Sequence, residues 1–135
     1  MTGVLADVNI EGHVNYLMAL VRAAPWADLW EELGVKYLTF GDVSLDREAT
    51  DSEVWRVCQE RELVLITGNR NSAGADSLEA TIRVSNTNQS LPVLTISNTE
   101  RFKNNRDYAK EVVVSLVRVL IGIDELRGTG RLYLP

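Results

Sequence analysis

The stretch Leu63-Val-Leu-Ile-Thr67 constrains the fold of this chain more than any other. It is a short apolar run that stops at Thr67-Gly68 and gives way to polar residues. Such a run predicts a strand that is buried on both faces, as in a parallel sheet. A buried parallel strand that ends in a polar segment is where α/β proteins place their ligands, because the strand fixes the backbone and the loop is free to vary.

The remaining segments alternate between strand and helix patterns. Short apolar runs predict further strands over 3–7, 35–40 and 91–96, and a short last strand over 131–134. Apolar residues at helical spacing predict helices over 10–23, 26–33, 50–61, 73–84 and 108–125, with loops over 43–49 and 97–105. This alternation predicts an α/β fold, a three-layer α/β/α architecture around a mainly parallel, doubly wound sheet.

The composition of the chain limits the number of domains, the cellular compartment and the kinds of ligand that we expect. A chain of 135 residues with 45% hydrophobic and 24% charged residues is expected to form a single domain, 1–135. It has no apolar run of membrane-spanning length, no secretory signal pattern and one cysteine, Cys58, so we expect a reduced, cytoplasmic setting. The net charge of −5 argues against nucleic-acid binding by the whole surface, but it allows a local basic patch or a metal-filled acidic cleft.

In a parallel sheet, the carboxyl ends of all strands meet at one edge, which we call the carboxyl rim. Polar residues follow most of the expected strands. Those expected at the rim are Asp7, Asn9, Gly41, Asp42, Thr67, Asn69, Asn71, Ser97 and Asn98. Asp51, at the start of the 50–61 helix, can join them.

Three short motifs follow one another along about the first half of the chain: Leu5-Ala-Asp-Val-Asn9, Thr50-Asp-Ser-Glu-Val54 and Ile66-Thr-Gly-Asn-Arg-Asn71. In this order they resemble the motifs of PIN-like domains, and most closely those of the short stand-alone PIN-like proteins that open with Leu-Asp-Glu-Asn. The resemblance implies a PIN-like fold and a metal-dependent ribonuclease of toxin type, holding Mg²⁺ or Mn²⁺ and acting on single-stranded RNA. An antitoxin-like protein partner and a homodimer are further expectations of this interpretation.

The resemblance also assigns residues. The family's acids fall on Asp7, Asp51, Asn69 and Asn71, which are the catalytic candidates, and the metal ligands would be Asp7, Asp51 and Glu53. The substrate-binding candidates are Asn9, Thr67 and Arg70, together with Arg101, Lys103 and Arg106 of a basic segment described below.

This chain departs from the family at Asn69 and Asn71, where the family has acids. An amide oxygen carries no charge, so a site that binds a hard dication mainly through carboxylates should bind it more weakly. Asp42, Asp76 or Glu79 can compensate if they lie within reach. The alternative is a catalytically impaired PIN-like protein that binds RNA or a protein. A response-regulator-like or nucleotide-binding domain is disfavoured, because a Gly-rich phosphate loop and a well-placed lysine are missing.

The segment Arg101-Phe-Lys-Asn-Asn-Arg106 is the densest positive stretch of this acidic chain. It precedes a predicted helix start, which favours anions, and Phe102 would offer an apolar face between the charges, as in proteins that bind single strands. The segment predicts contact with RNA phosphates, against the simpler interpretation of a solvated loop.

Simpler structural interpretations stand beside the functional ones. Asp7 can cap the next helix, Asp51 and Glu53 fit the first turn of a capping box, and the asparagines are common turn residues. His13 is expected to be a partly exposed helical residue, and Cys58 a small buried one. The tryptophans Trp26, Trp30 and Trp55 are expected to pack in the core or at a subunit contact.

Overall fold

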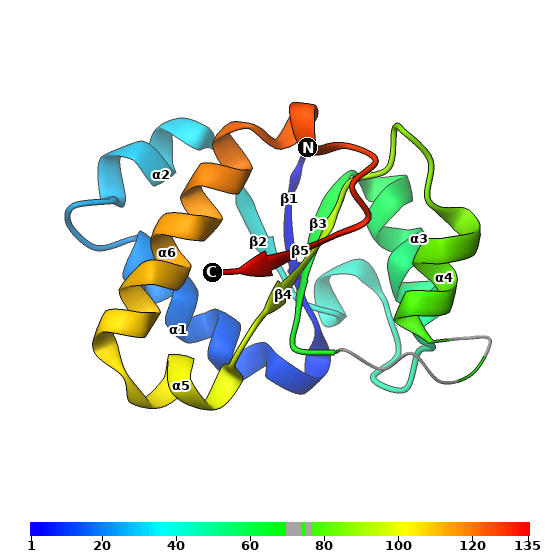
Figure 1. Cartoon of the computed structure of the whole chain (residues 1–135), viewed down its shortest axis with the longest axis horizontal. Coiled ribbons are helices and arrows are strands. Elements are labelled where there is room, and N and C mark those ends of the chain that lie inside the picture. The colour runs from blue at the N-terminus through cyan, green and yellow to red at the C-terminus, as the bar shows by residue number, and fades with distance from the viewer. Residues whose placement is uncertain (70–73, 75–76) are drawn as a thin grey trace.

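The computed structural model describes residues 1–69, 74 and 77–135 and is built around a five-stranded sheet (Figure 1). Its strands are β1 (Gly3–Ala6), β2 (Lys36–Leu38), β3 (Leu63–Thr67), β4 (Val93–Ile96) and β5 (Arg131–Leu134). They lie in the order β2-β1-β3-β4-β5, and each neighbouring pair is parallel. The predicted α/β/α fold with a parallel sheet is therefore confirmed.

Helices cover both faces of this sheet. They are α1 (Glu11–Val21), α2 (Ala27–Leu33), α3 (Asp51–Arg61), α4 (Leu78–Ser85), α5 (Thr99–Asn104) and α6 (Arg106–Ile121), with short 3₁₀ turns η1 (Val8–Ile10), η2 (Gly41–Val43) and η3 (Ile123–Leu126). The helices α1, α5 and α6 pack together on one face, and α3 packs with α4 on the other (Figure 1). None of the helices in the described ranges is long and apolar enough to cross a membrane.

Two hydrophobic cores fill the spaces between the layers, and β3 contributes to both. Val64 and Ile66 pack into the larger core under α1 and α6, whereas Leu63 and Leu65 pack into the smaller core under α3 and α4. Successive side chains of a strand point to opposite faces, so a central strand with a helix layer on each side must be apolar at every position. This requirement explains the unbroken apolar run from Leu63 to Ile66 in the sequence.

Several element boundaries differ from the sequence-based prediction. The expected loop over 97–105 contains a short helix, α5, because Asn98 caps it by accepting a hydrogen bond from the Arg101 amide. The long helix expected over 108–125 instead spans 106–121, and after Gly122 the chain tightens into η3. The start of the helix predicted over 73–84, near Asp76, lies outside the described residues.

The predicted capping box at the start of α3 is confirmed in its first half, the cap by Thr50. Thr50 Oγ1 accepts a hydrogen bond from the Glu53 amide at 3.2 Å, which satisfies one of the donors that a helix start otherwise leaves unpaired. The Glu53 carboxylate lies 3.4 Å from the Thr50 hydroxyl, rather than accepting from the Thr50 backbone amide as in a full capping box. The cap fixes where α3 begins, and it thereby places Asp51 in the first turn at the carboxyl rim.

Candidate functional site

The centre of the carboxyl rim lies between β1 and β3, where the order of the sheet reverses. The chain leaves β1 for β2 on one side and then crosses to β3 on the other side of β1. In open α/β sheets, this reversal leaves a crevice beyond the strand ends where ligands bind. Asp7 follows β1 directly and Thr67 ends β3, so both residues stand at this place (lower edge of Figure 1).

Asp7 is a nearly buried carboxylate, with 8% of its surface exposed. Its Oδ2 accepts a hydrogen bond from the Thr67 hydroxyl at 2.6 Å, and its Oδ1 accepts one from the Asn9 amide at 3.3 Å. A buried charge needs such donors, because burial without them is costly. Asp7 therefore caps η1, as the structural interpretation expected, and also holds the end of β3 against the end of β1.

Asn69 continues this chain of hydrogen bonds to Asp51. The Asn69 backbone amide donates to Thr67 Oγ1 at 2.9 Å, and its side-chain Nδ2 donates to Asp51 Oδ2 at 2.9 Å. The same Asp51 oxygen accepts from the Leu78 backbone amide at 3.1 Å. We call Asp7, Thr67, Asn69 and Asp51 the acid–amide network. Two acids that are 44 residues apart in the sequence are joined through only two intermediate residues.

Arg131, which sequence analysis missed, supports the network from β5. Its Nη1 donates to the Asn69 carbonyl at 2.8 Å and to the Thr95 hydroxyl, while its Nε pairs with Glu79 at 2.5 Å. The side chain is only 7% exposed, and its Nη2 is buried without a partner among the described residues. The one sequence signal was a charged residue that opens an otherwise apolar strand.

Two of the three acids that could have compensated for the asparagines, Asp42 and Glu79, are used elsewhere. Asp42 accepts from the amide and hydroxyl of Thr39, and Glu79 is paired with Arg131. Glu53 belongs to the capping box rather than to the network. Arg70, Asn71 and Asp76 lie outside the described residues.

A metal site needs several hard ligands around one point. Across 1–69, 74 and 77–135, no three His, Cys, Asp or Glu side chains come together in a way that could hold a metal ion. The two acids of the network instead receive hydrogen bonds from hydroxyl, amide and backbone donors. This donor set does not fit the carboxylate cage that Mg²⁺ or Mn²⁺ prefers.

The other sequence-predicted members of the site differ in exposure. Asn9 is exposed on η1, and only its backbone amide has a described role in the network, as a donor to Asp7. Thr67 is fully buried, so its hydroxyl positions its neighbours and is not available to a ligand from solvent. His13 is half-buried on α1, as expected.

Cys58 is not a nucleophile. Its side chain lies in the smaller core, and burial, with a smaller effect of the Asp7 charge, raises the pKa of the thiol to about 12. A thiol that stays protonated at neutral pH is unreactive, so the expected structural role is confirmed. Trp30 and Trp55 are also buried in the cores, as expected, and Trp26 packs against the larger one.

The basic segment lies at the carboxyl rim but presents different residues from those expected. Arg101, Lys103 and Arg106 are exposed, and the Arg101 guanidinium lies 4.7 Å from the centre of the Tyr108 ring. Phe102, however, is completely buried, because α5 turns it into the larger core. The expectation that Phe102 offers a face to RNA is therefore wrong.

Beside this segment, α1 and α5 form a shallow cavity of about 410 Å³, lined by Gly12, His13, Tyr16 and Lys103. The buried Phe102 supports it from below, with ring centres 6.3 Å from His13 and 5.3 Å from Tyr16. Tyr16 is 36% exposed. The cavity thus combines exposed aromatic surface with a lysine.

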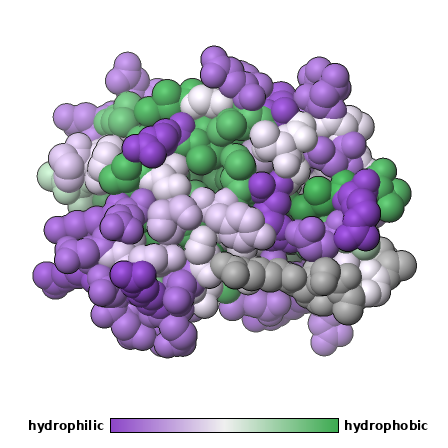
Figure 2. Space-filling view, viewed as in Figure 1, coloured by the Kyte–Doolittle hydropathy of each residue, from purple (hydrophilic) through white to green (hydrophobic). Residues whose placement is uncertain are grey.

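Gly68, which lies between Thr67 and Asn69 of the acid–amide network, packs against η1 and the start of α5. A Cβ at Gly68 would lie 3.0 Å from Thr99 Cγ2 and 3.3 Å from Ile10 Cγ2, so the end of β3, the start of α5 and η1 pack tightly. Distances this short leave little room for any side chain. The molecular surface over α5 is hydrophilic (lower left of Figure 2, which is viewed as in Figure 1).

No family model, curated protein or solved structure matches this chain. The assignment of function therefore depends on the geometry of the rim and on the motifs in the sequence.

Proposed function

We propose that this chain is a PIN-like domain that binds single-stranded RNA along its carboxyl rim, with Asp7 and Asp51 supporting the rim rather than holding a catalytic metal. The observation that carries the proposal is the hydrogen bonding of Asp51. Its Oδ2 accepts from the Asn69 side-chain amide and from the Leu78 backbone amide. If the Asp51 carboxylate rotated to bind a metal cation, it would lose these two hydrogen bonds from neutral donors.

The surface beside the network supports RNA binding. Single-strand binders combine cations that follow the phosphates with aromatic rings on which bases stack. Here Tyr16 and Lys103 share one cavity, and Arg101 and Arg106 stand on the same segment as Lys103. In a chain of net charge −5, RNA affinity must come from such a local group of cations.

The test measures binding of a short fluorescently labelled oligouridine by anisotropy at several salt concentrations. Replacing Arg101, Lys103 and Arg106 by alanine should weaken binding and flatten its salt dependence, because each phosphate contact releases counterions. Tyr16→Ala should weaken binding with little effect on the salt dependence, since stacking involves no charge.

A matched control removes three exposed cations away from the rim, Arg22, Lys36 and Arg61, and so gives the same net charge. The RNA affinity of this control variant and its salt dependence should equal those of the native protein. If both triple variants lose affinity equally, the effect is one of overall charge and the proposed surface is wrong. Absence of RNA binding by the native protein would also overturn the proposal.

A second candidate is the divalent-metal-dependent ribonuclease of toxin type, with an antitoxin-like partner. It is favoured by one observation, that Asp7 and Asp51 both lie at the rim and are joined through Thr67 and Asn69. Calorimetric titration with Mn²⁺ and an RNA cleavage assay in Mn²⁺ or EDTA separate the two candidates. Cleavage that requires Mn²⁺ and disappears in Asp7→Asn would replace the binding proposal with this one.

A further inference from the structure

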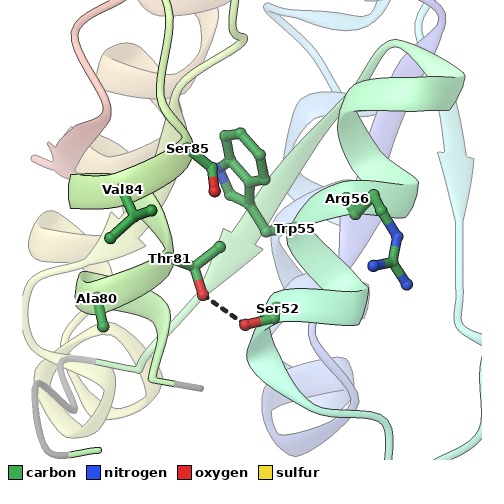
Figure 3. A pocket seen from close by; sticks show the side chains of 7 residues that line it. All are labelled: Ser52, Trp55, Arg56, Ala80, Thr81, Val84 and Ser85. Atoms are coloured by element: carbon green, nitrogen blue, oxygen red, sulfur yellow. Dashed lines mark hydrogen bonds between the residues drawn. The ribbon is translucent and has the colours of Figure 1, made fainter. Parts of the chain in front are cut away.

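The helices α3 and α4 line a second pocket (Figure 3), and they lie on the opposite face of the sheet from α1 and α5 (Figure 1). Its volume is about 280 Å³. Ser52, Trp55 and Arg56 line it from α3, and Thr81 and Val84 are among the residues that line it from α4. None of these residues belongs to the acid–amide network or to the basic segment.

Hydroxyl groups fasten the two helices across one end of the pocket. Thr81 Oγ1 donates to the Ser77 carbonyl at 2.9 Å and lies 2.7 Å from Ser52 Oγ (Figure 3). Either hydroxyl can be the donor in the contact between Ser52 and Thr81. This contact joins the two walls of the pocket at that end.

Trp55 supplies a hydrogen-bond donor that has no acceptor among the described residues. Its side chain is 7% exposed, and its indole ring reaches from α3 toward α4, between the two helices (Figure 3). The indole Nε1 is buried without a hydrogen-bond partner in the part of the chain that the structure describes. Buried tryptophan N–H groups usually find a partner, and an unpaired one is destabilising. An acceptor from another molecule would remove this cost.

Charge and exposure indicate what kind of acceptor fits. Among the described residues that line the pocket, Arg56 is the one that carries a charge, and it forms no ion pair with any of the described residues. Val84 is 83% exposed, the highest value among the exposed large hydrophobic residues. Hydrophobic surface also appears beside hydrophilic surface where α3 and α4 lie (right of Figure 2). A carboxylate next to an apolar side chain complements these groups.

We propose that the α3–α4 pocket is a docking site for an acidic segment of a partner protein. A carboxylate side chain of that segment accepts from Trp55 Nε1 and pairs with Arg56, and a neighbouring apolar side chain covers Val84. The pocket is slightly smaller than the range of about 300–1,000 Å³ typical of small-molecule sites, and it suits one or two side chains of a peptide. Trp55 and Arg56 belong neither to the acid–amide network nor to the basic segment, so each site can be tested with its own variants.

The test is a selection of peptides from a random phage-displayed library on the native chain, followed by affinity measurements on the enriched peptides. We expect enriched peptides to contain Asp or Glu beside an apolar residue. Trp55→Phe keeps an aromatic ring but removes the donor, and Arg56→Gln removes the charge, so each should weaken binding by about tenfold or more. Arg61→Gln, an exposed change near the end of the same helix, is the matched control and should have no effect.

Each other outcome overturns the proposal. The pocket does not dock acidic peptides if no peptide is enriched, if enriched peptides lack acids, or if they bind both variants as tightly as the native chain. If inorganic phosphate or sodium glutamate shifts the Trp55 indole N–H resonance while no peptide is enriched, the pocket takes a small anion instead. Should Trp55→Phe fail to fold by circular dichroism, the exposed Arg56→Gln variant decides the matter alone.

Discussion

The hydrogen bond from Asn69 to Asp51 gives the sharpest test of the acid–amide network. Asn69→Asp replaces the donor with a second carboxylate at a position 2.9 Å from Asp51 Oδ2. A hydrogen bond to a charged group contributes about 1.5–3 kcal/mol. Two unit charges about 3 Å apart repel by about 5 kcal/mol at an effective dielectric constant near 20. Both side chains are half-buried, so screening and rotation of the new carboxylate reduce this repulsion.

We therefore expect Asn69→Asp to lower the free energy of unfolding by about 2–4 kcal/mol at pH 7 in EDTA, which corresponds to a melting temperature lower by about 5–15 °C. The loss should shrink near pH 4. A carboxyl group that holds its proton more tightly when folded contributes stability below its unfolded pKa of about 3.9 and loses it as the pH rises. Once protonated, it can donate to Asp51 as the native amide does.

Asn69→Ala is the matched control, because it removes the same hydrogen bond without adding a charge. Its loss of stability should be smaller and should lack the additional pH dependence. Thermal melts of the three proteins at pH 4 and pH 7, in EDTA, measure both effects. If Asn69→Asp has the melting temperature of the native protein at pH 7, or that of Asn69→Ala at both pH values, then Asn69 and Asp51 are not coupled as described.

Three further predictions concern metal binding, the buried thiol and an ion pair. Restoring both acids with Asn69→Asp and Asn71→Asp should tighten Mn²⁺ binding in calorimetric titration, and unchanged affinity would mean that these positions do not face a metal. Cys58 should react with a thiol reagent only after unfolding in denaturant, since burial raises its pKa to about 12; rapid reaction of the native protein would contradict this. The hydrogen bond from Arg127, at 2.7 Å, lowers the pKa of Glu62, so this pair stabilises the fold above the unfolded pKa of Glu62 and loses that effect as the pH falls. Glu62→Gln should cost at most about 1 kcal/mol at pH 7, because Glu62 is 45% exposed, and nothing near pH 3; a cost independent of pH would refute it.

Sequence patterns predicted those features that depend on neighbours along the chain. The apolar run of β3 and the helix cap at Thr50 are local signals, and both are confirmed. The placement of Asp7 and Asp51 at one rim also followed, since a parallel sheet brings its strand ends together.

What sequence reasoning missed depends on contacts between distant segments. Phe102 sits among polar residues, and only the packing of α5 against α1 shows that it belongs to the core. Arg131 is recognisable as part of the site only once β5 lies beside β4, where it reaches Thr95 and the Asn69 carbonyl. The unpaired indole nitrogen of Trp55 depends equally on the position of α4, which no local pattern specifies.

The position of Arg131 on β5 has a consequence for how the rim is assembled during synthesis. Asp7 leaves the ribosome early, whereas Arg131 emerges more than 120 residues later, on the last of the five strands to be made. Until then, the Asn69 carbonyl and Glu79 lack the guanidinium that holds them. A nascent chain that stops before β5 therefore lacks the support that Arg131 gives the network. Arg131 follows Asn69 by 62 residues, so at translation speeds of about 5–20 residues per second this interval lasts about 3–12 s, during which the incomplete rim is accessible to chaperones and proteases.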